Sequence, residues 1–410
     1  MMRAGSVLVS LVLVSCSPNK AVDTDATVGT EAGTSADTGA PTGTSTSTST
    51  SAGTGTSTGA GAGTSTGAGT DTGPGTDIDT EPTTAADTGE TGETGAVRCD
   101  GPSAYEITVL ASGVVQPGTL ALDPTHVWWV GAPGYMMNCA KDGCANAPTT
   151  VLTEQPNPID IIVDGGKVYW SLAAKTGLCG SDGFVMQCDA DDCEATATSI
   201  VLSVCSAGLA VDAKNVYIAE YSGGAGTVER CARTGCGGNS DEVAAVSGGP
   251  TSVAVSGSTL VWTAGPAMPG DDGAVFTCNA MNCVPQVLAT GPKILPASIA
   301  TDVQRAYWPN GDGSIMACAL TGCDNKPQVL ATGQDFAATI ATDGVDVVWG
   351  TTPMGPGGVY KIAVDGSEPE PTTVATGAMV FSPGSVAMDA DSIYWTDFNT
   401  DLIVRARKCP

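Results

Sequence analysis

Residues 383–397 read PGSVAMDADSIYWTD, and variants of this stretch recur from residue 119 onward. Each copy has a short apolar segment that usually ends in Asp, a polar turn of three or four residues, and a second segment that carries an aromatic pair in most copies. Two such segments joined by a short polar turn predict a β-hairpin. The seven copies begin at Thr119, Pro158, Ser206, Pro250, Pro296, Ala337 and Pro383.

The copies are regularly spaced, with 41 to 48 residues between the positions that end their first segments. The aspartates that end the first segment are Asp123, Asp164, Asp212, Asp302, Asp343 and Asp389, with Ser256 in the fourth copy. Six of the seven tryptophans occupy one repeat position, namely Trp129, Trp170, Trp262, Trp308, Trp349 and Trp395, and Ile218 occupies it in the third copy. A fixed period with a recurring aromatic position indicates a repeat architecture.

Each copy continues through a Gly-rich loop into a third segment, such as GFVMQC or GSIMAC, and then into a fourth, such as PQVLATG. Four short antiparallel strands in about 44 residues are the size of one propeller blade. The sequence therefore predicts an all-β fold, a seven-bladed β-propeller of four-stranded blades, over residues 97–410.

The two ends of this region predict how the ring closes. The last copy stops after its third segment, LIVRARKC (402–409), and EITVLASG (106–113) reads like the missing fourth. We therefore expect the N-terminal strand to complete the seventh blade, because this pairing removes the open edge of the ring.

Fourteen cysteines follow residue 97, an even number, which favours disulfides in an exported chain. Ten of them form pairs that bracket the turn between the third and fourth segments. Cysteines on either side of a four-residue hairpin loop are expected to face each other across the strand ladder, at a separation that a disulfide can span. The pairs are Cys139/Cys144, Cys188/Cys193, Cys231/Cys236, Cys278/Cys283 and Cys318/Cys323.

The remaining cysteines and the sixth copy complete this plan. In the sixth copy Ile362 and Ser367 replace both members of the pair together, as expected of a covalent pair. Cys99 and Cys409 are expected to form a disulfide that joins the two ends of the propeller, and we pair Cys179 with Cys205. Zinc is the rival interpretation, but each blade would supply only two ligands.

The N-terminal fifteen residues have Arg3 followed by a short apolar run, which is typical of a signal peptide and too short to span a bilayer. The run ends in LVSC, which resembles the bacterial lipobox. The resemblance implies cleavage between Ser15 and Cys16 and a lipid on Cys16, which anchors the chain to a membrane. The alternative is an ordinary secretory signal with a chance cysteine. Ser17 rather than Asp after the cysteine favours the outer membrane, at its periplasmic or cell-surface face.

Residues 16–96 contain almost only Thr, Ser, Gly, Ala, Asp and Glu, and no aromatic residue. Such a segment cannot bury enough apolar surface to offset chain entropy, so we expect a disordered linker that holds the propeller away from the membrane. Its eleven acidic residues face a single basic one, Lys20. The domains predicted are thus 1–15, 16–96 and 97–410.

Composition and motifs exclude several functions. The chain carries 43 acidic and 16 basic residues. This excess of acidic residues argues against nucleic-acid binding, which needs a basic surface. Its single histidine, His126, excludes a multi-histidine zinc site, and no serine-hydrolase, zinc-protease or phosphate-loop motif occurs. We identify no catalytic residue and no required cofactor. His126 beside Val127 and Trp128 is expected to be structural.

Acidic turns are the one feature that suggests a cation. Asp and Gly oxygens of this kind can bind Ca²⁺, but the same residues are favoured in solvated hairpin turns. None of these turns matches the EF-hand pattern. The weak Ca²⁺ candidates are Asp189, Asp191, Asp271, Asp272 and Asp312.

The repeat resembles the YWTD β-propeller repeat of low-density-lipoprotein receptors, most fully at Ile393-Tyr394-Trp395-Thr396-Asp397. It departs from that family in having seven blades and hairpin cysteines, and the overall arrangement looks more like Cys-rich propeller lipoproteins of myxobacteria. The resemblance implies a propeller with a binding role.

Three functions remain open. The first is an envelope-anchored binding or scaffold module for a protein or glycan, which would use the variable loops between second and third strands. The second is a structural or adhesive surface protein. The third is a propeller lyase or hydrolase that uses loop carboxylates or Ca²⁺.

Overall fold

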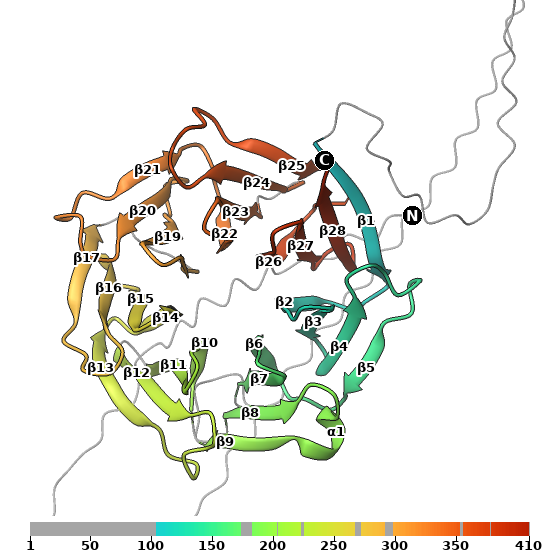
Figure 1. Cartoon of the computed structure of the whole chain (residues 1–410), viewed down its shortest axis with the longest axis horizontal. Coiled ribbons are helices and arrows are strands. Elements are labelled where there is room, and N and C mark those ends of the chain that lie inside the picture. The colour runs from blue at the N-terminus through green and yellow to red at the C-terminus, as the bar shows by residue number, and fades with distance from the viewer. Residues whose placement is uncertain are drawn as a thin grey trace, which may run out of the picture. The chain divides into compact units, whose positions relative to one another are not determined.

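The computed structural model describes residues 104–173, 183–202, 204–222, 225–266, 272–291, 298–352, 356–377 and 379–409. These residues form seven four-stranded antiparallel sheets arranged in a ring around a central channel (Figure 1). The predicted all-β, seven-bladed propeller is therefore confirmed.

The first six blades use four strands in chain order, numbered from the channel outward. Blade 1 contains β2 (Pro117–Leu122), β3 (His126–Gly131), β4 (Tyr135–Ala140) and β5 (Thr149–Leu152). Blade 2 contains β6 (Pro158–Asp164), β7 (Lys167–Leu172), β8 (Phe184–Asp189) and β9 (Thr198–Leu202). Blade 3 contains β10 (Ser206–Val211), β11 (Asn215–Ser222), β12 (Ala225–Ala232) and β13 (Asp241–Ser247).

Blades 4 to 6 repeat the same order. Blade 4 contains β14 (Pro250–Ser256), β15 (Thr259–Ala264), β16 (Gly273–Asn279) and β17 (Gln286–Gly291). Blade 5 contains β18 (Ala300–Thr301), β19 (Arg305–Pro309), β20 (Ile315–Ala319) and β21 (Gln328–Ala331). Blade 6 contains β22 (Ala337–Thr342), β23 (Asp346–Thr351), β24 (Gly358–Ala363) and β25 (Thr372–Thr376).

Blade 7 closes the ring with both ends of the propeller. It contains β26 (Pro383–Met388), β27 (Ser392–Asp397) and β28 (Leu402–Lys408), and its outer strand is β1 (Tyr105–Ser112). The β1 strand pairs antiparallel with β28 from Tyr105 opposite Lys408 to Ser112 opposite Leu402. The predicted closure by the N-terminal strand is confirmed.

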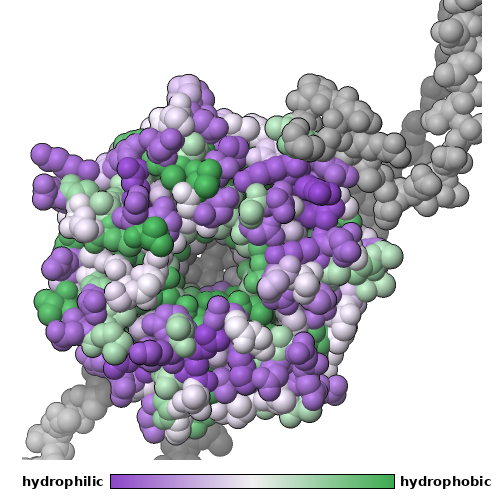
Figure 2. Space-filling model, in the orientation of Figure 1, coloured by the Kyte–Doolittle hydropathy of each residue, from purple (hydrophilic) through white to green (hydrophobic). Residues whose placement is uncertain are grey.

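The antiparallel order gives the propeller two different faces. Turns between the first and second strands, and between the third and fourth, lie on one side, which we call the cysteine face because the five hairpin disulfides lie there. Loops between the second and third strands, together with the blade-to-blade connections, lie on the opposite side, the loop face. Figure 2 shows one face of the molecule, where hydrophobic residues surround the central opening and hydrophilic residues dominate the periphery.

The hydrophobic core is divided into seven clusters, one between each pair of neighbouring blades. The aromatic pair explains this arrangement, because successive side chains of a strand point to opposite faces of the sheet. In blade 2, Trp170 packs against blade 1 and Tyr169 packs against blade 3. All seven tryptophans are at most 2% exposed.

In blades 1, 3, 5, 6 and 7 the repeated aspartate caps the hairpin of the two inner strands. In blade 5 one carboxylate oxygen of Asp302 accepts hydrogen bonds from the N–H groups of Gln304 and Arg305, both at 2.7 Å, and the other accepts from the Tyr307 hydroxyl at 2.7 Å. Asp123 makes the same three bonds in blade 1, with the Trp128 indole in place of the tyrosine. Burial would raise the pKa of Asp123, but these donors outweigh it and hold the pKa below its ordinary value.

The five predicted hairpin disulfides are confirmed, with Cα–Cα distances of 4.8 to 5.7 Å. The first cysteine of each pair lies on the third strand of its blade and is buried on the same face as the tryptophan position. Ile362 takes this place in blade 6. These first cysteines are Cys139, Cys188, Cys231, Cys278 and Cys318.

The position of the second cysteine differs from our expectation that the two would face each other across the ladder, and this part of the prediction is wrong. No second cysteine of the five pairs lies on a fourth strand. Four of them lie in the turn that precedes that strand and are only partly buried, at the edges of the core clusters: Cys144, Cys236, Cys283 and Cys323.

Two successive turns explain this position. In blade 1 the Gly143 N–H donates to the Ala140 carbonyl, which reverses the chain directly before Cys144. The Ala147 N–H then donates to the Cys144 carbonyl, so β5 does not begin until Thr149. The same two hydrogen bonds recur around Cys236 and Cys323. Each of these disulfides therefore closes the turn itself, and strand pairing begins only after it.

The fifth second cysteine, Cys193, begins a short helix, α1 (Cys193–Thr196), instead of a plain turn. Thr196 stabilises this helix by donating its hydroxyl to the Asp192 carbonyl. Unlike the other four, Cys193 is fully buried.

Two further cysteines, Cys205 and Cys409, are also disulfide-bonded. Their predicted partners, Cys179 and Cys99, lie outside the described residues, so these two pairings stay predictions. The predicted signal peptide, its cleavage after Ser15, the lipid on Cys16 and the linker likewise lie outside them.

Candidate functional site

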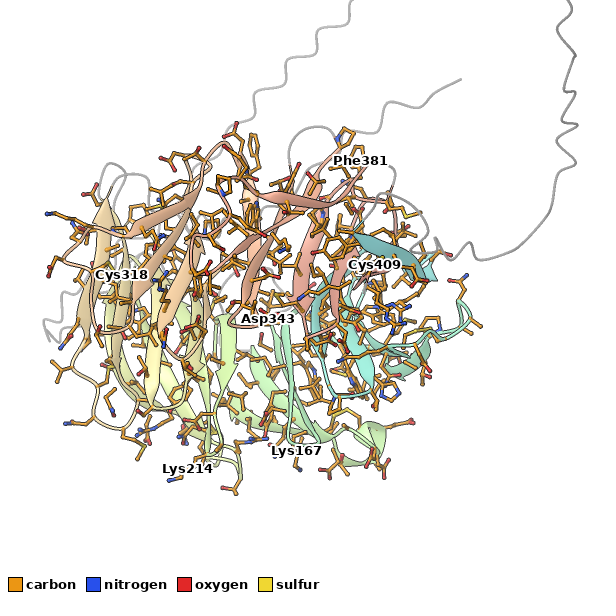
Figure 3. All side chains as sticks on the ribbon, turned by 45° about the horizontal axis from the view of Figure 1, so that its top comes forward. Lys167, Lys214, Cys318, Asp343, Phe381 and Cys409 are labelled. Carbon is orange, nitrogen blue, oxygen red and sulfur yellow. A yellow bond between two sulfur atoms is a disulfide. The ribbon has the colours of Figure 1, made fainter. Side chains whose placement is uncertain are left out.

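Exposed apolar side chains gather on the loop face at blades 6, 7 and 1. We call them the loop-face arc, and they are 37 to 58% exposed: Val115, Phe336, Met379, Phe381 and Phe398. Each lies on a blade connection or on the loop after β27. In Figure 3, Phe381 lies near the top, and Lys167 and Lys214, at the turns between the first two strands of blades 2 and 3, lie near the bottom. Large exposed apolar groups in one place are typical of an interaction surface.

The buried carboxylate of Asp397 organises the centre of this arc. One oxygen accepts hydrogen bonds from the N–H groups of Phe381 and Ser382, at 2.6 and 2.8 Å. The other accepts from the N–H groups of Asn399 and Thr400, at 3.2 and 3.0 Å. Asp397 thus fixes the connection that carries Phe381 and the loop that carries Phe398. It is the last residue of the YWTD sequence, which gives this motif a structural role in presenting the surface.

Backbone hydrogen bonds connect the rest of the arc. The Thr352 N–H donates to the Phe336 carbonyl, and the Gly357 N–H donates to the Phe381 carbonyl. At the other end, Asp401 accepts from Val114 N–H through its carbonyl and from Gln116 N–H through its carboxylate, so it fixes both neighbours of Val115. The apolar side chains are therefore presented by connections that hydrogen bonds hold in place.

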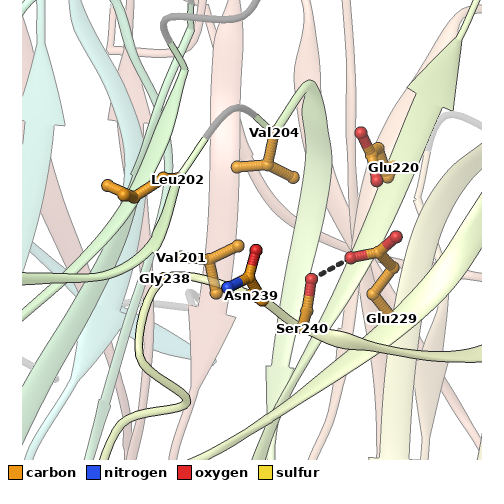
Figure 4. A pocket seen from close by; sticks show the side chains of 8 residues that line it. All are labelled: Val201, Leu202, Val204, Glu220, Glu229, Gly238, Asn239 and Ser240. Carbon is orange, nitrogen blue, oxygen red and sulfur yellow. Dashed lines mark hydrogen bonds between the residues drawn. The ribbon is translucent and has the colours of Figure 1, made fainter.

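A second feature is a cavity of about 280 Å³ between blades 2 and 3 (Figure 4). Apolar side chains from the end of the outer strand of blade 2 and from the connection after it line one side of the cavity, and residues of blade 3 line the other. The lining residues are Val201, Leu202, Val204, Glu220, Glu229, Gly238, Asn239 and Ser240.

Two carboxyl groups share the polar side of this cavity. Thr227 connects them, since its hydroxyl lies 3.5 Å from Glu220 Oε2 and 3.1 Å from Glu229 Oε1. The Ser240 hydroxyl donates to the other oxygen of Glu229. Burial, and then the hydrogen bond and charge of Glu229, raise the pKa of Glu220 to about 7. Glu220 therefore gains or loses its proton near neutral pH, and among the described residues no basic side chain lines the cavity.

The carboxyl pair lies where blade 3 departs from the repeat. Glu229 stands opposite Ile218, the residue that replaces the tryptophan. In the other six blades the residue opposite the tryptophan is apolar or aromatic: Met137, Met186, Phe276, Met316, Tyr360 or Val404. Sequence reasoning missed this site, although the missing tryptophan at Ile218 was the signal that could have led to it.

The four predicted Ca²⁺ candidates that the structure describes do not form one cluster. Asp189 forms an ion pair with Lys167 at 2.7 Å, and Asp312 accepts from the N–H and hydroxyl of Ser314. Asp191 and Asp272 are exposed on different blades, and Asp271 lies outside the described residues. Within the described part of the chain, no group of three or more His, Cys, Asp or Glu could hold a metal ion.

His126 takes part in the hairpin of blade 1. Its Nδ1 lies 2.9 Å from the Thr125 hydroxyl and 3.6 Å from Asp123 Oδ2, and its ring meets Trp128 edge-on. These contacts give the residue a place in the turn.

Comparisons with known proteins show the fold alone. No family model and no curated protein matches the sequence. Among solved structures, the chain is similar to the U3-55K structure, with TM-score 0.54, 12% identity, and coverage of 75% of this chain and 100% of that one. It is similar to the RRP9 WD40 repeats at TM-score 0.53, 11% identity and coverage of 73% and 97%. A chain of the mitotic checkpoint complex matches at TM-score 0.53, 10% identity and coverage of 80% and 98%.

In the described ranges, no helix has the length and apolar character needed to cross a membrane.

Proposed function

We propose that this chain is an exported, lipid-anchored binding module that presents a propeller to a protein partner. The loop-face arc carries the proposal, because a rigid scaffold holds three phenylalanines, a methionine and a valine exposed on adjoining connections. Propellers with this fold include WD40-repeat structures and a chain of the mitotic checkpoint complex. The YWTD-like and lipoprotein resemblances of the sequence support the same role.

Two groups of cysteines support the proposed location of the protein outside the cytosol. Five hairpin disulfides favour an oxidising compartment outside the cytosol. The LVSC sequence before residue 17 supports a lipid on Cys16, and two or more acyl chains form a stable membrane anchor. The low-complexity segment that follows then serves as a tether at the outer membrane.

The binding role can be tested by photo-crosslinking in cells that express the full chain. A photoreactive phenylalanine analogue is placed at Phe381 or Phe398, and at Val345 on the cysteine face as an exposed control. We expect one discrete protein adduct from the two arc positions and none from Val345. Adducts that are absent, or equal at all three positions, would contradict the proposal. An arc-dependent glycan adduct would identify the other ligand class.

The anchor can be tested separately. Full-length protein with Cys16→Ser should fail to incorporate labelled palmitate and should leave the membrane fraction. The matched variant Ser17→Ala should retain both. If Cys16→Ser remains lipid-labelled and membrane-bound, the proposed anchor is wrong.

A further inference from the structure

The loop-face arc has a charge environment that specifies the kind of partner it fits. This inference rests on the proposed function. The described part of the chain contains eleven basic residues, all in turns or strand regions near the cysteine face. They are Lys141, Lys167, Lys214, Arg230, Arg233, Arg305, Lys326, Lys361, Arg405, Arg407 and Lys408.

Many of these cations join neighbouring blades. Lys141 of blade 1 bonds Asp389 of blade 7 at 2.9 Å, which closes the ring on this face. Lys408 of blade 7 lies 3.5 Å from Asp343 of blade 6, and Arg233 of blade 3 pairs with Asp164 of blade 2. These cations are held at the blade seams and are directed away from the loop face.

The arc is instead bordered by carboxylates. Asp335 directly precedes Phe336 and is exposed, and Asp401 lies between Phe398 and the connection that carries Val115. Neither carboxylate forms an ion pair within the described residues. Two further lysines, Lys175 and Lys293, follow β7 and β17 in the sequence and lie outside the described residues.

We infer that the loop-face arc binds a basic protein segment in which Lys or Arg side chains alternate with apolar ones. The apolar side chains would cover Phe381 and Phe398, and the cations would meet Asp335 and Asp401. Charge complementarity argues against two other occupants. The chain's own segment 17–96 has eleven acidic residues and one basic residue, and a second copy that met the arc with its own arc would present the same carboxylates.

The test uses the chain from residue 16 onward with Cys16→Ser and three short synthetic peptides. In the first peptide Lys alternates with Phe, in the second Glu alternates with Phe, and in the third Lys alternates with Ser. Fluorescence anisotropy should show binding of the first peptide at least about tenfold tighter than of the other two. This binding should weaken as salt is raised, because exposed charges are screened.

Variants locate the binding. Asp335→Asn with Asp401→Asn keeps the side-chain acceptor for Gln116 and should weaken binding of the first peptide about tenfold. Asp142→Asn, which removes one exposed charge from the cysteine face, is a control and should leave binding unchanged. The double variant Phe381→Ser with Phe398→Ser should abolish binding of the first peptide. Thermal unfolding of each variant checks that the fold is intact.

Two results would overturn the inference: equal binding of the acidic peptide, or equal losses from the Asp142 control and the arc variant. Self-association that saturates the arc would also overturn it. If the carboxylate variant keeps its affinity for the first peptide and still crosslinks at Phe381, that result refutes the basic character of the partner but not the binding function. Loss of crosslinking as well would refute both.

Discussion

At the scale of single residues, the repeated aspartate is the clearest link between sequence and stability. In blades 1, 3, 5 and 7 its carboxylate caps two backbone N–H groups of a turn and accepts a third hydrogen bond from an aromatic residue of the next strand. The sequence showed this residue as a recurring end of a segment. The structure adds its partner five positions later, because strand pairing brings the two side chains together.

Asp302→Ala should therefore destabilise the fold by about 2–3 kcal/mol, since it removes two caps and leaves the buried Tyr307 hydroxyl unsatisfied. Thermal unfolding with disulfides intact measures the loss. Val303→Ala changes an 83% exposed side chain of the same turn and should cost less than about 0.5 kcal/mol. Equal losses for the two variants would argue against the capping role.

Glu220 predicts a pH dependence at the seam of blades 2 and 3. Its folded-state pKa of about 7 lies above its ordinary value of 4.5, so the folded chain binds a proton that the unfolded chain releases. The free energy of unfolding should then fall as pH rises from about 4.5 to about 7, and stay lower above that range. Asp160, which accepts from the Leu209 N–H across the same seam, has a pKa raised by burial to about 6 and contributes with the same sign.

Unfolding measured from pH 4 to pH 8 tests this dependence. Glu220→Gln should be more stable than the parent at pH 8 and should flatten the slope. The control Glu154→Gln alters an exposed carboxylate on the loop face and should leave the profile unchanged. A profile identical in Glu220→Gln and the parent would show that the pair is not responsible.

At the scale of elements, each hairpin disulfide supplies part of the buried packing between neighbouring blades. The Cys231 sulfur is buried in the cluster between blades 2 and 3, on the face where Ile218 takes the tryptophan position. Blade 6 shows the alternative, because Ile362 fills the same place without a covalent bond. The covalent bond and the buried volume can therefore be separated by mutation.

Cys231→Ala with Cys236→Ser should cost about 2 kcal/mol from the closed loop alone, plus the cavity left by the sulfur. Cys231→Ile with Cys236→Ser copies blade 6 and should lose less, because isoleucine refills the seam. Thermal unfolding of both double variants compares them. If the Ile variant is the less stable of the two, the contribution of Cys231 does not come from the volume that it fills between the blades.

At the scale of the whole molecule, the ring depends on β1 as the outer strand of blade 7. Deleting residues 104–112 should expose the edge of β28 and cause aggregation or loss of the cooperative transition. Size-exclusion chromatography and thermal unfolding detect either result. Deleting residues 61–69, an equally long stretch of Gly, Ala, Ser and Thr, should change neither. A cooperative monomer without β1 would contradict this role.

The sequence by itself determined the blade count, the closing strand and the pairing of the hairpin cysteines. Each of these follows from local spacing, because a hairpin and its turn are contiguous in the chain and the repeat shows them several times. Spacing did not show that the second cysteine, such as Cys144, Cys283 or Cys323, lies in the turn, because turn hydrogen bonds decide where the fourth strand begins.

The loop-face arc and the carboxyl pair depended on the tertiary structure. Phe336 and Phe398 are 62 positions apart in the chain. Glu220 and Glu229 meet within one hairpin, but they line a cavity only because blade 2 packs beside that hairpin. Only the closed ring decides which connections adjoin and which side chains meet at a seam.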